Sequence, residues 1–259
     1  MKIVVFKYGE CLYPENKIFY GVKSEKKIPM SFCFYLIQTD KKKVLVDVGC
    51  DGKERYNFYV YSKTTDLLGQ YGLTPDDITD VIITHAHFDH IGSAFEIAKA
   101  NDATIISTAE ICYLAEENGC KAHAMHLGGT YKFPFGKVRL TLAFHGSGIP
   151  GGHACGFVVD FYDTKFYFAG DTALFGDMQL LPQLDAFDYA ILPIGGNFTM
   201  DPKDAAIAAK FLAAKYVIPV HYNTWPPIAQ DVEAYKADVE ANTASKVLIV
   251  KPGETIELE

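Results

Sequence analysis

The chain has 259 residues, and 49% of them are hydrophobic, which is enough for one large domain with a sizeable core. The net charge of −8 and the scattered lysines leave no basic stripe, so we do not expect a nucleic acid partner. The six cysteines have irregular spacings and form no CxxC pair, which predicts free thiols in a reducing compartment. No leader peptide is visible, and no apolar run approaches the roughly 20 residues that span a bilayer. We therefore expect a cytoplasmic protein without a membrane segment.

Short apolar runs at the start of the chain predict an antiparallel sheet. The runs are KIVVFKY, SFCFYLIQT and KKVLVDVGC, and Asp40 and Lys41 between the last two suit a hairpin turn. Helical patterns follow over residues 64–71 and 92–100, and VIITH between them predicts a buried strand. In TPDDI, Thr74 is expected to be the N-cap of a helix that has Pro75 at its first position.

The second half repeats this order of strands and helices. Strands are expected at ATIIST, KVRLTLAFHG, CGFVVDFY, KFYFAGD, DYAILPIGG, YVIPVHYN and SKVLIV, and helices at AEICYLAEENG, PKDAAIAAKFLAAK and QDVEAYKADVEAN. Strand runs followed by helices, twice over, predict an α/β fold in which two sheets pack face to face with helices outside. No linker rich in serine, glycine or proline divides the halves, so we expect residues 1–259 to form a single domain.

The stretch THAHFDHIG places three of the chain's eight histidines and an aspartate at the end of a buried strand. Residues two apart on an extended segment point the same way, so His85 and His87 can offer their imidazoles to one ion. Asp89 and His90, where the chain turns into a helix, can face a second ion. Such ligands suit borderline divalent metals such as zinc. The alternative is chance clustering or helix capping, but polar groups at the end of a buried strand are costly unless they are paired or coordinate something.

Further ligand-type residues end β-like runs in the second half of the chain. His145 follows TLAF, Asp171 follows FYFAG, and His221 follows VIPV. Active sites are often built from such strand ends on a rigid scaffold. His153 in PGGHACG competes with His145, and we prefer His145 because it directly ends a strand, whereas His153 follows a glycine-rich loop. The two other central histidines lie in an expected loop, CKAHAMHLGG, and are interpreted as solvated: His123 and His126.

The order HxHxDH, His, Asp, His resembles the metallo-β-lactamase superfamily, and LVDVG at 45–49 looks like its early aspartate-bearing strand motif. The resemblance implies a four-layer αβ/βα sandwich. AGDTALFGDM, LPIGGNFTMDPKDA and IPVHYNTWP are similar to small metal-dependent hydrolases related to ascorbate-6-phosphate lactonase, although their usual GHS motif is absent. FCFYLIQTDKKKVLVDVG looks more like acyl-homoserine lactonases. The resemblance implies that one ion is bound by His85, His87 and His145. It implies that the other ion is bound by Asp89, His90 and His221, and that Asp171 bridges the two.

Two divalent ions about 3.5–4 Å apart bind one bridging water, lower its pKa and polarise a scissile carbonyl or phosphoryl oxygen. We expect zinc, with manganese and iron as alternatives. Asp89 is placed to hold the hydroxide and pass its proton to the leaving group. Tyr222 and Asn223 could act as oxyanion donors, although a tyrosine after a strand is more often a packing residue. The sequence thus predicts a metal-dependent hydrolase of a small ester, lactone or phosphoester, which is compatible with a homo-oligomer.

Other functions on the same fold fit the sequence less well. A di-iron oxygen or nitric-oxide reductase would carry glutamate where His87 stands, and a non-catalytic metal-binding protein should have lost Asp89 or a ligand. Superfamily ribonucleases carry an inserted domain or a basic arm, for which this acidic chain has no room. The aromatic segment RYNFYVYSKTTD, residues 55–66, could form a roof over the metal site, but core packing or a dimer contact explains it equally well. Trp225 could line the same pocket.

Overall fold

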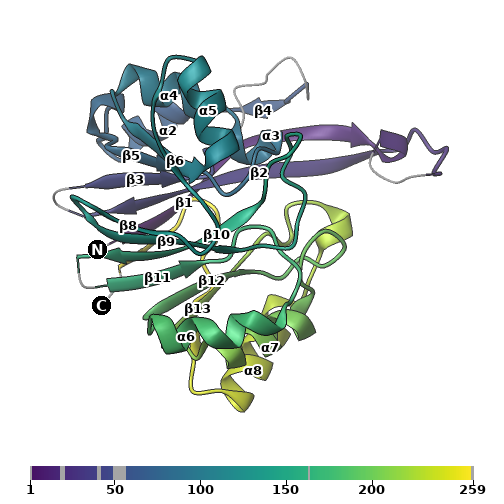
Figure 1. Cartoon of the computed structure of the whole chain (residues 1–259). Helices are drawn as coiled ribbons and strands as arrows, with labels where there is room; N and C mark the ends of the chain where they lie inside the picture. The colour runs from purple at the N-terminus through teal and green to yellow at the C-terminus, as the bar shows by residue number, and fades with distance from the viewer. Residues whose placement is uncertain (1, 18–20, 40–41, 49–56, 163, 258–259) are drawn as a thin grey trace.

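Two β-sheets lie face to face at the centre of the molecule, and helices cover the outer face of each sheet (Figure 1). The computed structural model describes residues 2–17, 21–39, 42–48, 57–162 and 164–257. The predicted αβ/βα sandwich is therefore confirmed. In the described ranges, no helix has both the length and the hydrophobicity that crossing a bilayer requires.

The first sheet has the strand order β15-β1-β2-β3-β5-β6-β7, and β4 pairs with β1. Neighbours are antiparallel from β15 to β3 and parallel from β3 to β7. The predicted pairing of the second and third apolar runs is confirmed, and the predicted turn at Asp40 and Lys41 lies outside the described residues. The strands are β1 (Lys2–Pro14), β2 (Lys27–Gln38), β3 (Lys43–Val46), β4 (Val60–Tyr61), β5 (Asp80–Ile82), β6 (Thr104–Thr108), β7 (Lys121–Met125) and β15 (Thr255–Glu257).

The second sheet has the order β14-β13-β12-β11-β10-β9-β8. Its antiparallel half runs from β8 to β11, and its parallel half runs from β11 to β14. The strand predicted at SKVLIV is present but short. The strands are β8 (Thr130–Phe133), β9 (Gly136–Leu142), β10 (Cys155–Phe161), β11 (Thr164–Phe168), β12 (Tyr189–Pro193), β13 (Tyr216–Val220) and β14 (Lys246–Val247).

Each sheet packs helices on its outer face, so the molecule has three layers of buried apolar side chains. Figure 1 shows α2, α4 and α5 on one sheet and α6, α7 and α8 on the other. The middle layer joins side chains from both sheets. The helices are α2 (Thr64–Gln70), α3 (Phe88–Ile91), α4 (Ala94–Ala100), α5 (Ala109–Glu117), α6 (Leu181–Leu184), α7 (Pro202–Leu212) and α8 (Val232–Asn242), with 3₁₀ turns at Glu15–Lys17, Pro75–Asp77, Gly176–Leu180 and Pro226–Ile228.

Two local predictions were wrong, and one predicted helix begins later than expected. The helix expected to follow Thr74 is a single 3₁₀ turn, and its hydrogen bonds run the other way: the Asp77 carboxylate accepts from the Thr74 backbone N–H (2.8 Å) and hydroxyl (2.9 Å). The helix expected over residues 92–100 is present as α4 and begins two residues later, after Gly92, with a φ of 30°, ends α3. His123 lies in strand β7 and not in a loop.

Candidate active site

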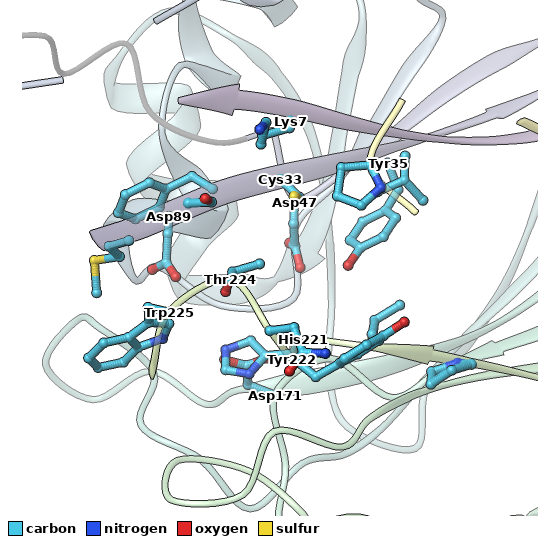
Figure 2. A pocket seen from close by; sticks show the side chains of 18 of the residues that line it. Lys7, Cys33, Tyr35, Asp47, Asp89, Asp171, His221, Tyr222, Thr224 and Trp225 are labelled. Atoms are coloured by element: carbon cyan, nitrogen blue, oxygen red, sulfur yellow. The ribbon is translucent and has the colours of Figure 1, made fainter. Parts of the chain in front are cut away.

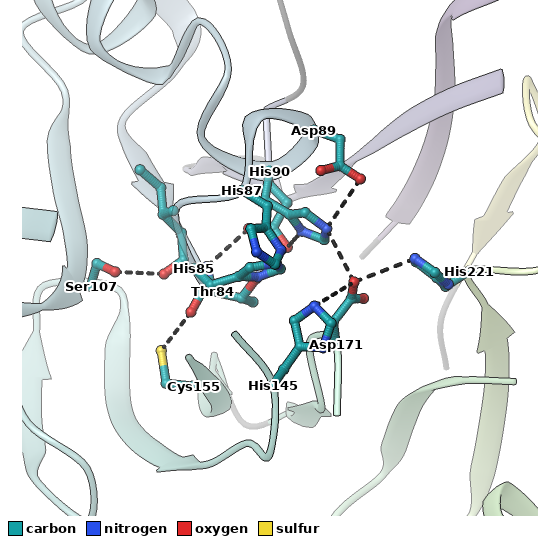
Figure 3. Close-up of polar contacts among 12 residues, drawn as sticks. Thr84, His85, His87, Asp89, His90, Ser107, His145, Cys155, Asp171 and His221 are labelled. Atoms are coloured by element: carbon teal, nitrogen blue, oxygen red, sulfur yellow. Dashed lines mark hydrogen bonds and ion pairs between the residues drawn. The ribbon is translucent and has the colours of Figure 1, made fainter. Parts of the chain in front are cut away.

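The residues predicted to bind metal lie together at one edge of the sandwich (Figure 3). They belong to segments that follow strands of both sheets, and α3 is the one helix that contributes. Because the carboxyl ends of β3, β5, β11 and β13 meet at this edge, residues far apart in sequence become neighbours. His85 and His87 follow β5, Asp89 and His90 belong to α3, and single residues follow β9, β11 and β13: His145, Asp171 and His221.

Three histidines form the first ligand group. His85, His87 and His145 place their ligand atoms within 4.8 Å of one another, and His85 Nε2 lies 2.9 Å from His87 Nδ1. Burial lowers the pKa of His85 well below its usual value, and burial also lowers the pKa of His145. Both imidazoles are therefore neutral near pH 7, and a neutral imidazole has the lone pair that a metal ion binds.

Asp171 connects this group to the remaining ligands. Its Oδ2 atom lies 3.3 Å from Nε2 of His221, 3.4 Å from Nε2 of His90 and 3.7 Å from Nε2 of His145. Two ligands of one tetrahedral ion, each about 2.0–2.2 Å from it, lie about 3.4 Å apart. The spacing around Asp171 is therefore that of ligands around shared ions, and the mixed nitrogen and oxygen donor set suits a borderline divalent metal.

The second ligand group consists of His85, His90 and Asp171, and its ionised carboxylate favours a cation. Burial opposes ionisation of Asp171, but the surrounding imidazoles, His221 first, hold the pKa of its carboxyl well below its usual value. Burial also opposes protonation of His90, but the carboxylates of Asp47, Asp89 and Asp171 raise the pKa of this imidazole well above its usual value. A buried carboxylate that remains ionised beside histidines, as Asp171 does, is a suitable ligand for a divalent cation.

Asp47, in the LVDVG motif, orients two of these histidines. Its Oδ2 atom accepts hydrogen bonds from Nδ1 of His90 (2.8 Å) and from the Thr84 hydroxyl (2.7 Å), and its Oδ1 accepts from the Thr84 backbone N–H (2.9 Å). The Thr84 oxygen in turn lies 3.0 Å from Nδ1 of His85. Both Nε2 atoms are thereby directed at the cluster. Sequence reasoning missed this role; the signal was an aspartate at the end of a buried apolar run.

Backbone geometry fixes the cluster further. The Ala86 N–H donates to the Ser147 carbonyl at 2.7 Å, which holds the loop after His145 against the histidine motif. Gly148 makes this approach possible, because a Cβ there would lie 2.4 Å from the Ala86 carbonyl carbon, and its φ is +80°. Asp47 and His221 also have left-handed φ values, 51° and 55°, and such strained positions cluster at functional sites.

The other histidines lie outside this cluster. His153 is exposed, and its ring lies 6.0 Å from that of His126. Neither belongs to the two groups of described residues whose geometry could hold a metal ion. His123 packs against Tyr131 with the two rings tilted by 41° and 4.0 Å between their centroids. Of the two candidates for the third position, the structure therefore brings in His145.

A cavity of about 890 Å³ opens beside the cluster (Figure 2). Tyr222 lines it, and burial raises the pKa of this phenol, which remains a hydrogen-bond donor. Asn223 also lines the cavity, but its side-chain oxygen accepts from the Gln230 N–H at 2.7 Å, so it serves the local turn. Trp225 lies at the cavity wall, as predicted, and stacks on Phe198 with ring centroids 5.5 Å apart.

The aromatic segment does not form a roof over the site in its described part, which begins at Asn57. Phe58 packs edge-on against Phe32, with centroids 5.4 Å apart, and stacks on Tyr61 at 5.6 Å. Tyr59 points to solvent and is 57% exposed. None of the described residues 57–66 lines the cavity. Of the alternatives for this segment, the roof is therefore ruled out for these residues, and core packing accounts for Phe58.

Comparison with known proteins agrees with this geometry. The sequence model of the metallo-beta-lactamase superfamily matches residues 34–221. The chain belongs to this superfamily. It is 56% identical over 178 residues to a UPF0173 metal-dependent hydrolase of Natranaerobius thermophilus. The matched residues make up 69% of this chain and 80% of that relative. A UPF0173 metal-dependent hydrolase of Listeria monocytogenes is 42% identical over 235 residues, or 87% of this chain and 96% of the relative.

Solved structures of metallo hydrolases also resemble this chain. Igni18, a metallo hydrolase from Ignicoccus hospitalis, is 28% identical and superposes with a TM-score of 0.73 over 100% of both chains. The isothiocyanate hydrolase from Delia radicum gut bacteria shares the fold, with a TM-score of 0.66 and 20% identity over 100% of this chain and 99% of that one. The protein is a metal-dependent hydrolase, and its His/Asp cluster is able to bind metal.

Proposed function

We propose that this hydrolase binds two divalent metal ions, zinc in the first place, and cleaves a small ester, lactone or phosphoester. The observation that carries the proposal is the position of Asp171 Oδ2, which lies 3.3–3.7 Å from Nε2 atoms supplied by three separate segments of the chain. Such a carboxylate can bridge two ions. The residues assigned to the two ions and the bridge are His85, His87 and His145; Asp89, His90 and His221; and Asp171.

The chemistry needs both the ions and side chains that move protons. Two divalent ions at this site would acidify a water molecule and polarise the scissile bond. The Asp89 side chain is 31% exposed, whereas that of Asp171 is 9% exposed. Asp89 can therefore take the proton of the attacking water and deliver it to the leaving group at the cavity side. We assign Tyr222 as a hydrogen-bond donor to the oxyanion that develops on the substrate.

The cavity favours a small molecule as the substrate. Its volume of about 890 Å³ lies within the range of small-molecule sites, about 300–1,000 Å³. Di-iron redox chemistry is a poorer interpretation because His87 stands where those relatives carry glutamate. Its imidazole joins those of His85 and His145 in the first ligand group.

A substrate screen tests the proposal. The purified protein, loaded with zinc, manganese or iron, is assayed against lactones, thioesters, phosphomonoesters and phosphodiesters. We expect turnover in at least one class and a loss of about 10²–10⁴ in kcat for Asp89→Asn at matched metal content. Asp102→Asn, a change at an exposed aspartate that does not line the cavity, is the control and should leave kcat unchanged. Equal turnover by Asp89→Asn would remove Asp89 as the proton carrier, and no turnover in any class would contradict the substrate proposal.

A further inference from the structure

Tyr35 closes the inner end of the cavity beside the cluster. It lines both this cavity and a second void of about 10 Å³ that lies further in between the sheets. Among the described residues around the void, Tyr35 alone has a polar side-chain atom. A void of this size holds at most one water, and an apolar one stays dry. A substrate at the cluster therefore extends inward only as far as the Tyr35 side chain.

Strand β2 directs this side chain towards the second sheet. Residues alternate between the two faces of a strand, and Phe34 and Leu36 belong to the apolar layer between the first sheet and its helices. Tyr35 and Cys33 therefore face the space between the sheets, and both line the cavity. The Tyr35 ring lies edge-on against Phe168 of β11, with ring centroids 5.5 Å apart and planes 69° apart. Aromatic pairs prefer this packing, so the contact holds the ring in place.

The Tyr35 hydroxyl is free to bind a ligand in the cavity. It makes no hydrogen bond with any residue in the described ranges, and Figure 2 shows it pointing towards the side of His221 and Tyr222. The Asp47 carboxylate, which also lines the cavity, already accepts three hydrogen bonds from residues of the histidine motif. Burial raises the pKa of the Tyr35 phenol well above its usual value, so the hydroxyl keeps its proton and remains a donor.

Two phenols from different sheets line this part of the cavity. Tyr35 belongs to β2 of the first sheet, and Tyr222 directly follows His221 after β13 of the second sheet. Burial raises the pKa of both phenols, so both are neutral hydrogen-bond donors near pH 7. Preorganised donors of this kind stabilise an oxygen atom on which negative charge develops during a reaction. The role assigned to Tyr222 thus extends naturally to a second donor on the facing sheet.

The proton carrier lies on the other side of the site. In Figure 2, Asp89 lies towards Trp225, whereas Tyr35 lies on the opposite side of Asp47. In a tetrahedral intermediate, the oxyanion and the leaving group are different substituents of the reacting atom and point in different directions. Because Asp89 is assigned to the leaving group, the side that Tyr35 occupies is left for the oxyanion.

We propose that Tyr35 is a catalytic residue, whose hydroxyl donates a hydrogen bond to the carbonyl or phosphoryl oxygen of the substrate. The oxygen of the attacking water forms a bond to the carbon or phosphorus, and an electron pair of the C=O or P=O bond moves onto the oxygen that Tyr35 contacts. The pair returns when the bond to the leaving group breaks, and the leaving group takes the proton that Asp89 received from the water. Tyr35 keeps its own proton throughout. This inference rests on the proposed hydrolase function and adds a residue of the first sheet to it.

Removing the hydroxyl tests this role. Tyr35→Phe keeps the ring against Phe168, and it is assayed at matched metal content with the substrate class that the screen identifies. We expect kcat to fall about 10²-fold and KM to change less than about threefold, because the charge develops only in the transition state. Tyr113→Phe removes a hydroxyl from a tyrosine that is 59% exposed and does not line the cavity, and it should keep both constants. An unchanged kcat in Tyr35→Phe would overturn the inference.

A leaving-group series distinguishes an oxyanion donor from an acid that serves the leaving group. Aryl substrates of the active class that differ only in their ring substituents change the leaving group and keep the reacting centre. The loss of kcat in Asp89→Asn should grow as the leaving group becomes more basic, because a basic leaving group depends more on the delivered proton. The loss in Tyr35→Phe should stay the same across the series. A loss in Tyr35→Phe that grows in parallel with that of Asp89→Asn would contradict the oxyanion role.

Binding without turnover separates this inference from the proposed function. The zinc-loaded protein is titrated calorimetrically with methylphosphonate, a tetrahedral anion, and with acetate, a planar one. We expect Tyr35→Phe to raise the Kd of methylphosphonate about tenfold and that of acetate less than about threefold, with unchanged zinc content and circular dichroism spectrum.

Two results would divide the proposals. Methylphosphonate binding that depends on Tyr35, in a protein that turns over no substrate, would support the donor and overturn the proposed reaction. Equal methylphosphonate affinity in Tyr35→Phe and the unmodified protein, with turnover that also does not depend on Tyr35, would overturn this inference and leave the hydrolase standing.

Discussion

His90 donates its Nδ1 hydrogen to Asp47 Oδ2 at 2.8 Å, and its Nε2 atom then lies 3.4 Å from Asp171. The two residues are 43 positions apart and come together because β3 and β5 are parallel neighbours in the first sheet. This hydrogen bond fixes which nitrogen of the imidazole can bind an ion. A carboxylate behind a metal-binding histidine also raises the basicity of the imidazole.

Replacing this carboxylate should weaken metal binding. In Asp47→Asn, the hydrogen bond to His90 Nδ1 loses its charge, and the amide can present its NH₂ group to the ring. We expect metal affinity to fall about 10–100-fold, measured by competition with a chromogenic chelator. Asp102→Asn is the matched control, because Asp102 is exposed and its carboxylate contacts only Lys121 among the described residues. Unchanged affinity in Asp47→Asn would contradict the orienting role.

The two histidines that competed for the third ligand position should behave differently. We expect His145→Ala to lose bound metal, because its imidazole lies in the first ligand group. His153→Ala should keep the full content, because His153 is exposed and outside both groups. Inductively coupled plasma mass spectrometry of each protein after gel filtration gives the numbers. Full metal content in His145→Ala would contradict the assignment of His145 as a metal ligand.

Metal binding should release protons near neutral pH. In the metal-free protein, burial opposes protonation of His90, but Asp47, Asp89 and Asp171 raise the pKa of this imidazole well above 6.5. At pH 7 it is therefore protonated, and an ion must displace about one proton to bind it. His85, whose pKa burial lowers, is already neutral and adds no proton.

Affinity should accordingly rise with pH until the pKa of His90 in the metal-free protein is passed. Calorimetry of zinc binding at pH 7 in buffers with different ionisation enthalpies measures the release. We expect the apparent enthalpy to change from buffer to buffer by the heat of about one proton. An enthalpy that is the same in every buffer would show that His90 is neutral before the ion binds.

Much of the fold could be predicted from the sequence because hydrophobic residues recur at regular spacing in most strands and helices. Alternating runs gave β1 and β2, and the helical pattern over residues 64–71 gave α2. The ligand-type residues were also visible, because His145, Asp171 and His221 each follow a β-like run. The element ends were less predictable: Gly92 separates α3 from α4, and its φ of 30° depends on the packing around it.

Features that depend on tertiary contacts could not be predicted. Phe58 lies in an aromatic run that reads equally well as a substrate roof, and only its contact with Phe32 shows that it belongs to the core. The strand around His123 has no clear alternation, because β7 is an edge strand. The role of Asp47 requires knowing that its strand lies beside β5, and one sequence does not contain that pairing.

A buried ion pair away from the site should support stability. Asp185, which is 4% exposed, accepts from Lys137 Nζ at 2.6 Å and from Arg139 Nε at 3.0 Å, and so ties the end of α6 to β9. We expect Asp185→Asn to lower the free energy of unfolding of the metal-free protein by about 1–3 kcal/mol at pH 7. Urea denaturation measures this. Asp177→Asn, at an exposed aspartate nearby, should change it by less than about 0.5 kcal/mol.

The same pair predicts a pH dependence. Burial opposes ionisation of Asp185, but hydrogen bonds from Lys137 and Arg139 outweigh it and hold the pKa of the carboxyl below 3.8 in the folded protein. The unfolded state therefore takes up the proton first. The stability from this group is complete above about pH 4 and is lost as the pH falls through the lower folded-state pKa. The difference between the unmodified protein and Asp185→Asn should shrink in that acid range, and a difference that grows there would contradict the assignment.

The most direct test of the central claim is a metal titration of activity. The chelator-stripped protein is reloaded with zinc in steps, and bound metal per chain is measured alongside turnover of the best ester or lactone from the screen. We predict no turnover without metal and full turnover at two bound ions per chain. In His85→Ala, we expect both the bound metal and the turnover to be lost. Full turnover in the metal-free protein, or at one bound ion with no gain at the second, would contradict a dinuclear hydrolase.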